Sequence, residues 1–371
     1  MASIQKRPNG AWRARYRDDL GKEHARHFAR KIDAQAWIND VTAAVVTGSY
    51  VDPKRSRVTL EAFFEDWSQR QVWADNTVTA MSLAVRGCTF ARTPLGQVRR
   101  SHVETWVKQM QSDGLAASTI RTRVSNVRSV LRAAARDRLI ASDPSEGVKL
   151  PRIRRAEHAM QVPSPEAVGA ALNAAPDWFR LFISLCAFAG LRLGEASGLQ
   201  LGDIHFLKRQ MHVARQIQRA GSGTIKITPP KHGSERHVFI ADELVTMIAR
   251  HSEEIGVRGE EQWLFVGPTG EPPHQNTVGY WWRKALKDAN LEPFRLHDLR
   301  HYYASGLIAA GCDVVTVQRA LGHAKATTTL NTYGHLWPTA EDRTRAAAAD
   351  LMTTARGLTA DSSRQSATST A

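Results

Sequence analysis

The stretch at residues 146–165 interrupts the chain with prolines and cations and follows neither a helical nor a strand period. Because amphipathic patterns resume on both sides, the chain has to fold as separate bodies joined by an extended segment. Its 371 residues are enough for two or three domains. We predict a Ser/Thr/Ala-rich disordered tail at 352–371, a linker at 149–162, and folded units at 1–57, 58–148 and 163–351.

The first unit alternates in the manner of strands at residues 12–16 and 24–30, on either side of a turn at 18–21. A helical pattern follows at 32–46, with Asp33 in the position of an N-cap. These signals predict a small sheet plus one helix.

The second unit has helical periodicity from Leu60 onward. Ser101 and Glu104 have the spacing of a capping box, and Ser118 is placed to cap a longer helix. The expected apolar side of that longer helix consists of Ile120, Val124, Val127, Leu131 and Ala134.

The third unit is mostly helical, and its apolar run at 181–191 is too short to span a bilayer, so we expect a buried core helix. Short strands are predicted at 204–206, 211–216, 224–227 and 237–240. The fold class expected for the whole chain is therefore mainly α with small β-sheets (α+β).

The charge balance favours a polyanionic partner. Lys and Arg number 50 against 36 Asp and Glu, which gives a formal net charge of +14 and a pI near 10.1. Cations that neutralise phosphates release counterions, so such a surplus is typical of DNA-binding proteins. A basic protein kept soluble by its charge is the alternative.

Three groups of arginines are candidates for DNA contact. One lies on a predicted strand face, one forms a stripe on the long helix, and one lies in the linker, where a basic strap could close two domains around a duplex. For the strand face and the helix stripe, a solvated charged face is the competing explanation. The candidates are Arg13, Arg15, Arg17, Arg121, Arg128, Arg132, Arg152, Arg154 and Arg155.

Cysteine spacing and the N-terminus bear on the compartment. Cys88, Cys186 and Cys312 lie far apart, so neither a zinc ribbon nor a disulfide framework is predicted. The basic N-terminus has no apolar segment of the kind found in signal peptides. We expect a protein of a reducing cytoplasm that is not associated with a membrane.

Phosphodiester chemistry without a metal requires a nucleophile, cations for the phosphate oxygens, a base and an acid. The sequence has neither a carboxylate cluster for Mg²⁺ nor a GxxxxGK[ST] loop for ATP, so no metal or cofactor is expected. It does place Arg192 and Glu195 in the glycine-flanked segment GLRLGE, directly after the apolar run. Lys231 lies near the tip of a predicted hairpin, and Lys226 and Lys208 are weaker candidates.

Downstream, His297, Arg300 and His301 share one helix face, which suits a phosphate. The two histidines also have zinc-pair spacing, but position 298 is Asp and the HExxH glutamate is missing. Further along the chain, His323 precedes Tyr333 by ten residues. The phenol of Tyr333 needs nearby cations or a base to react at neutral pH.

The succession of GLRLGE, Lys231, the HDLRH segment, the LGH segment and Tyr333 resembles the tyrosine recombinase (phage integrase) family over residues 163–345. The resemblance implies a mixed α/β catalytic domain at 163–351, preceded at 58–148 by a helical, SAM-like core-binding domain. Residues 1–57 are similar to the arm-site DNA-binding domain of larger phage integrases, which implies a small three-stranded sheet plus a helix there.

The resemblance also implies a role for each matching residue. Arg192 and Arg300 would clamp the scissile phosphate, and His323 would donate a hydrogen bond to it. Lys231 would be the general acid for the 5′-hydroxyl, His297 the general base or proton relay, and Tyr333 the nucleophile that forms a 3′-phosphotyrosine. Glu195 would orient its neighbours, and His301 would support the site without contacting the reacting groups.

The function implied is site-specific recombination or viral genome integration, with a homotetramer on double-stranded attachment sites passing through a Holliday junction. A DNA-bending host factor and an excision factor are further expected partners. The location implied is the cytoplasm of a bacterial host cell, at the nucleoid. Two alternatives remain at this point: a type IB topoisomerase that relaxes DNA, which would not need the basic N-terminal unit, and a non-catalytic DNA-binding regulator.

Overall fold

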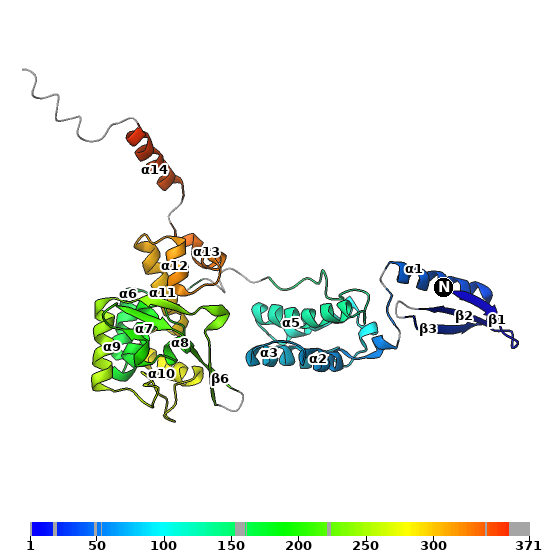
Figure 1. Cartoon of the computed structure of the whole chain (residues 1–371), viewed down its shortest axis with the longest axis horizontal. Helices are drawn as coiled ribbons and strands as arrows, with labels where there is room; N and C mark the ends of the chain where they lie inside the picture. The colour runs from blue at the N-terminus through cyan, green and yellow to red at the C-terminus, as the bar shows by residue number, and fades with distance from the viewer. Residues whose placement is uncertain are drawn as a thin grey trace, which may run out of the picture. The chain divides into compact units, whose positions relative to one another are not determined.

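The computed structural model describes residues 2–17, 21–47, 50–52, 54–152, 160, 162–220, 224–337 and 340–355. The chain divides into two compact units, Met1–His158 and Ala159–Ala371 (Figure 1). The division falls within the predicted linker at 149–162. Arg154 and Arg155 lie outside the described residues.

The N-terminal sheet contains three antiparallel strands in the order β1-β2-β3, namely β1 (Ser3–Lys6), β2 (Trp12–Arg17) and β3 (Glu23–Phe28). Helix α1 (Lys31–Val46) covers one face, where Ala14, Ala34 and Ile38 form a small core. The three-stranded sheet with one helix is therefore confirmed. Residues 18–20 of the predicted turn lie outside the described part of the chain.

The predicted cap of α1 is wrong. Arg30 occupies the N-cap position, and its guanidinium pairs with the Asp33 carboxylate, with Nε 2.9 Å from Oδ2. Asp33 lies in the first turn, where its charge still favours the positive end of the helix dipole.

The helical part of the first unit consists of α2 (Leu60–Ser68), α3 (Asp75–Arg86), α4 (Arg100–Ser112) and α5 (Ala117–Arg136), with short 3-10 turns at Arg55–Arg57 and Leu95–Gln97. The predicted apolar side of α5 is buried along its whole length, because residues with helical spacing share one face. Ser101 and Ser118 are not caps: Arg99 and Ala116 precede these helices, and the box of α4 pairs the Arg99 amide with His102 Nδ1 at 2.9 Å.

The arginine stripe on α5 contacts the segment that follows the helix. Arg128 donates to the Ser145 hydroxyl and carbonyl at 3.0 and 2.9 Å, Arg132 pairs with Asp143 at 3.4 Å, and Arg121 donates to the Pro151 carbonyl at 3.2 Å. Val148 is buried in the same core, and Leu150 packs against it. Part of the predicted linker therefore folds onto the helical unit.

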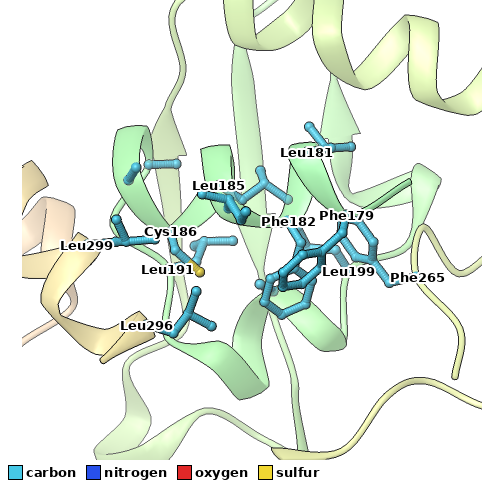
Figure 2. Close-up of a cluster of buried hydrophobic side chains, with 14 of the residues drawn as sticks. Phe179, Leu181, Phe182, Leu185, Cys186, Leu191, Leu199, Phe265, Leu296 and Leu299 are labelled. Carbon is cyan, nitrogen blue, oxygen red and sulfur yellow. The ribbon is translucent and has the colours of Figure 1, made fainter. Parts of the chain in front are cut away.

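The second unit surrounds the buried helix α7 (Asp177–Phe188). Its helices are α6 (Pro165–Ala174), α8 (Leu193–Ser197), α9 (Asp242–Glu254), α10 (Gln275–Asp288), α11 (Leu296–Ala309), α12 (Val314–Leu321), α13 (Ala326–Tyr333) and α14 (Ala340–Ala355), with 3-10 turns at Leu201–Asp203 and Gly334–Leu336. Figure 2 shows Phe179 and Phe182 of α7 beside Phe265, with Leu296 and Leu299 of α11 near Cys186. This core fixes the start of α11 against the end of α7.

Two small antiparallel sheets complete the unit: β4 (Ile204–His205), β5 (Gln210–Val213) and β8 (Arg236–Phe239) in one, and β6 (Gln216–Arg219) with β7 (Ile225–Thr228) in the other. The single strand predicted at 211–216 is wrong, because the chain leaves the first sheet after Val213 and enters the second at Gln216. The predicted Lys231 hairpin is also wrong. Residues Lys231–Gly233 form a 3-10 turn, η5, that connects β7 to β8 across the two sheets.

The disordered tail predicted from residue 352 begins too early, because Met352 to Ala355 continue helix α14. Among the described residues, no helix has the length and apolar character needed to cross a bilayer.

Candidate active site

The turn after α7 is shaped by two glycines. Gly190 has φ +64°, and a Cβ there would lie 2.4 Å from the ring of Tyr303. A Cβ on Gly194 would lie 2.7 Å from the Ile217 carbonyl of β6. Any larger residue at either position would push α8 away from its neighbours. Arg192, between the two glycines, is the N-cap of α8 and keeps 24% of its side chain exposed.

Glu195 is the electrostatic centre of this turn. It is 1% exposed, and Oε1 lies 2.6 Å from Arg192 Nη1, while Oε2 accepts from the Arg192 amide and from Arg236 Nη2, both at 3.0 Å. Burial alone would raise the pKa of Glu195, but Arg236 and then Arg192 outweigh burial and hold the pKa below its ordinary value. The carboxylate thus fixes two guanidinium groups.

Arg236 is a residue of the site that sequence reasoning missed. Only 7% of its side chain is exposed, and Nε donates to the Ala320 carbonyl at 3.0 Å, at the end of α12. It therefore ties strand β8 to both Glu195 and the segment that carries His323. Its signal in the sequence was a cation two residues before buried Val238, on the core-facing side of a strand.

Arg300 is 2% exposed and bridges two carbonyls, donating to Gly190 after α7 and to Leu321 at the end of α12. Burial and then repulsion from Arg192 lower the pKa of Arg300 to about 9, so it remains charged at neutral pH. This position draws together three segments that are far apart in the sequence.

The two histidines of α11 lie in different surroundings. His297 keeps part of its side chain exposed, but desolvation of its ring, followed by repulsion from His301 and Arg300, lowers its pKa to about 4. His301, expected to support the site at a distance, is the direct partner of the nucleophile candidate: its Nδ1 lies 2.8 Å from the Tyr333 hydroxyl. A zinc pair gains no support, because Nδ1 of His301 is engaged and no three candidate ligands gather within the described ranges.

His323 follows Gly322, which ends α12 in the left-handed conformation at φ +63°. Its Nδ1 lies 2.9 Å from the hydroxyl of Thr329, and its ring is parallel to that of Tyr333 with centroids 6.5 Å apart. Burial, followed by repulsion from Arg300, Arg192 and Arg236, lowers the pKa of His323 to about 4. The imidazole is therefore neutral at pH 7.

Tyr333 is the last residue of α13 and is 1% exposed, within a core that includes Ala304, Ile308 and Leu321. Burial raises its pKa to about 12, against the opposing effect of Arg300 and Arg192. The phenol therefore lies among the predicted cations, but it is covered in the protein alone. In this state it is neither ionised nor open to a phosphate.

Lys231 is a predicted catalytic residue with no direct contact to the other site residues among those described. Its side chain is exposed on the turn η5 and makes no hydrogen bond or ion pair with a described residue. The turn still connects it to the site, because Arg192 Nη1 lies 3.2 Å from the hydroxyl of Ser234, three residues later.

The arrangement combines fixed cations, neutral imidazoles and a phenol, which is a set suited to binding an anion and attacking it. Two guanidinium groups can neutralise equatorial phosphate oxygens, and a neutral imidazole can donate one further hydrogen bond. A phenol hydrogen-bonded to an imidazole has an acceptor for its proton. Phosphoryl transfer to Tyr333 is the chemistry that uses every one of these groups.

Comparison with known families agrees with this chemistry. Residues 163–339 match the phage integrase family, residues 2–47 match the N-terminal domain of phage integrases, and residues 75–140 match a second phage integrase N-terminal domain. The first of these matches lies in the second unit, and the other two lie in the first unit.

Related proteins include the ICEBs1 integrase of Bacillus subtilis, 25% identical over 67% of this chain and 70% of its own length. A putative prophage phiRv2 integrase of Mycobacterium tuberculosis is 26% identical over 86% of this chain and 87% of its own length. A tyrosine recombinase of Thermosipho africanus is 26% identical over 73% of this chain and 92% of its own length.

Solved structures share the fold. The Tn1549 transposon integrase in complex with circular intermediate DNA matches with a TM-score of 0.68 at 20% identity, over 79% of this chain and 99% of that one. A lambda integrase dimer bound to a COC′ core site matches with a TM-score of 0.56 at 18% identity, over 91% and 96%. The family itself is shown by the three family matches: the chain belongs to the phage integrase family, and a tyrosine recombinase is among its relatives.

Proposed function

We propose that this protein is a site-specific DNA recombinase that cuts and rejoins DNA through a 3′-phosphotyrosine at Tyr333 and a Holliday junction. The observation that carries the proposal is the position of the Tyr333 phenol. It is hydrogen-bonded to His301, its ring is parallel to that of His323, and the charges of Arg300 and Arg192 act on it. The relatives are integrases and a recombinase, which favours recombination over simple relaxation of DNA.

In the proposed mechanism Arg192 and Arg300 bind the non-bridging oxygens of the scissile phosphate. Fixed guanidinium groups stabilise charge that builds in the transition state without reorganising at that moment. His323 donates one further hydrogen bond to the phosphate. Glu195 supports the assignment, because it holds Arg192 through its Nη1 at 2.6 Å and so keeps the clamp in place before DNA arrives.

Proton transfers are assigned to Lys231 and to the histidines of α11. Lys231, exposed on its turn, protonates the 5′-oxygen that leaves. His297 remains the proposed general base or relay, with His301 next to it at a ring distance of 5.0 Å. His301 supports such a relay, since it already accepts from or donates to the phenol in the protein alone.

The covered phenol adds one requirement. With 1% of its surface exposed, Tyr333 has to be uncovered when DNA binds, so the protein alone is a resting state. A covered phenol favours cleavage only within an assembled complex, so that DNA is not cut before a second site is present.

The nucleophile is tested by replacing Tyr333 with Phe and incubating the variant with a nicked attachment-site substrate that loses its leaving strand after cleavage. We expect wild type to accumulate a covalent protein–DNA adduct and Tyr333→Phe to form none, because the attacking oxygen is gone. Tyr280→Phe, at a tyrosine that is 61% exposed, is the matched control and should react normally. An adduct with Tyr333→Phe would assign the nucleophile elsewhere.

The proposed partner is double-stranded DNA carrying attachment sites, bound by a homotetramer. Support comes from the lambda integrase structures, one a dimer on a core site and one a tetramer on a Holliday junction, the latter with a TM-score of 0.56. DNA is also the reason to place the activity in the bacterial cytoplasm, at the nucleoid. A DNA-bending host factor and an excision factor complete the proposed set of partners.

The first unit is proposed to provide two DNA-binding domains, at 1–57 for arm sites and at 58–148 for core sites, with the linker at 149–162 and the catalytic domain at 163–351. Arg13, Arg15 and Arg17 alternate on the sheet face opposite α1, a surface that fits a DNA groove. On α5, Arg121 and Arg132 keep exposed side chains and are proposed as phosphate contacts, as is Arg152. Arg128 is assigned to holding Ser145 instead.

Deleting residues 1–57 tests the arm-site role. Core-site cleavage should persist, because the site residues all lie in the second unit. Integrative recombination between two attachment sites should be lost. Full recombination by the truncated protein, measured by product formation on paired plasmids, would contradict the role.

A further inference from the structure

Thr329 is a buried hydroxyl for which the reaction as described has no use. It lies in α13, one turn before Tyr333, and is 0% exposed. Its Oγ1 lies 2.9 Å from Nδ1 of His323. Thr332 in the same helix makes the ordinary helical bond instead, donating to the Thr328 carbonyl at 2.9 Å. The hydroxyl of Thr329 is thus directed at the imidazole and not at its own helix.

The direction of this hydrogen bond follows from the need to satisfy a buried donor. A hydroxyl hydrogen without an acceptor is unfavourable in a protein interior. Within the described residues, Nδ1 of His323 is the acceptor that Thr329 Oγ1 reaches. Thr329 therefore donates and Nδ1 accepts, which leaves the imidazole hydrogen on Nε2.

This choice matters because His323 is neutral. Burial and the nearby guanidinium groups of Arg300, Arg192 and Arg236 hold its pKa at about 4. A protonated histidine donates from both nitrogens, but a neutral one donates from a single nitrogen. Nε2 has no partner among the described residues, so it is the nitrogen available to a phosphate.

We propose that Thr329 is a positioning residue of the reaction: by donating to Nδ1 of His323, it keeps the imidazole hydrogen on Nε2, where it faces the scissile phosphate oxygen. The inference rests on the proposed function, because it assumes that His323 binds that phosphate. The same hydrogen bond couples the phosphate ligand to the nucleophile, since Thr329 and Tyr333 lie one turn apart on one helix.

The first experiment needs no variant at the threonine. Full-length protein with ¹⁵N-labelled histidine is examined by NMR at pH 7, where the two ring nitrogens of each tautomer have distinct shifts, and His323→Gln identifies the signal. We expect His323 to carry its hydrogen on Nε2. A hydrogen on Nδ1 would overturn the proposal, whatever the variants do.

The second experiment compares Thr329→Val, which keeps the shape and removes the hydroxyl, with Thr329→Ser, which keeps the hydroxyl. Thr329→Val should show a mixture of tautomers and cleave a nicked substrate about tenfold more slowly in single turnover, a factor equal to about 1.4 kcal/mol, with unchanged DNA affinity. Thr329→Ser should keep the Nε2 tautomer and stay within about threefold of wild type.

Thr332→Val is the matched control, because it removes a hydroxyl from the same helix that bonds only to the backbone. It should change neither the tautomer nor the rate. Equal rates for Thr329→Val and Thr332→Val, or an unchanged tautomer in Thr329→Val, would overturn the proposal. Failure of the proposed function would appear separately, as an adduct formed by Tyr333→Phe, and would leave the tautomer result as it stands.

Discussion

Replacing Glu195 with Gln removes the charge of the central carboxylate, keeps the size of the side chain and turns one of its two acceptors into a donor. In the wild type its two oxygens accept from Arg192 Nη1 at 2.6 Å, from the Arg192 amide at 3.0 Å and from Arg236 Nη2 at 3.0 Å. A glutamine keeps one accepting oxygen and has an NH₂ group in place of the other. If its oxygen takes the place of Oε2, the bond from Arg192 Nη1 is lost and Nη1 faces the NH₂ donor.

The expected cost comes from the burial of the partners. Breaking a buried ion pair by removing one charge costs about 3–5 kcal/mol, because the remaining charge stays desolvated. Arg236 would remain desolvated, because only 7% of its side chain is exposed. Arg192 keeps 24% of its side chain exposed and can be hydrated again. We therefore expect the low end, about 3 kcal/mol, which corresponds to a factor of roughly 150 in an opening equilibrium.

Hydrogen exchange of the peptide covering α8 measures this local opening in the full-length protein. Exchange in Glu195→Gln should be faster by about that factor, and cleavage should fall as Arg192 loses its fixed position. Asp288→Asn is the control, since its pair with Lys284 on α10 is exposed on both sides and should cost about 0.5 kcal/mol or less. If α8 exchanged less than about fivefold faster in Glu195→Gln, the carboxylate would not be the support we describe.

Lowering the pH should destabilise the second unit between about pH 6.5 and pH 4. Burial, and next the neighbouring histidine and arginine side chains, hold the pKa values of His297 and His323 at about 4. The unfolded chain therefore binds protons in this window that the folded chain does not, so stability falls as the pH falls. The urea midpoint should be lower at pH 5 than at pH 7, and equal midpoints contradict the assignment. Arg128→Gln removes the two charged bonds to Ser145 and should destabilise that contact by about 2 kcal/mol, seen as faster exchange at residues 143–151. Unchanged exchange there, with weakened DNA binding, would return Arg128 to the set of DNA contacts.

The helical faces and the chemistry-bearing residues were predictable from sequence because both are recorded locally. The apolar residues of α5, from Ile120 to Ala134, recur at helical spacing, and the helix buries that stripe. Two of the three N-terminal strands, β2 and β3, follow from alternation in the same way, whereas β1 was not read from the residues. The segments that contain Arg192, Arg300 and Tyr333 were recognisable by their order along the chain.

Local signals failed where a competing partner lies at a distance. Ser118 has the chemistry of an N-cap, yet the helix starts one residue before it, at Ala117, with Ala116 as the N-cap. Residues 211–216 have the composition of one strand, but pairing with β8 ends at Val213 and pairing with β7 begins at Gln216. Strand pairing is decided by the partner strand, which the local sequence does not contain.

The sequence by itself determined which side chains this protein has for its chemistry: the residue types, their order and the helices that carry most of them. Only the tertiary structure decided what each of them touches. Glu195 meets Arg236 across 41 residues, His301 meets the phenol across 32, and Arg300 reaches Gly190 across 110. Such contacts depend on how buried surfaces pack and where desolvated charges find partners, and no local pattern encodes either.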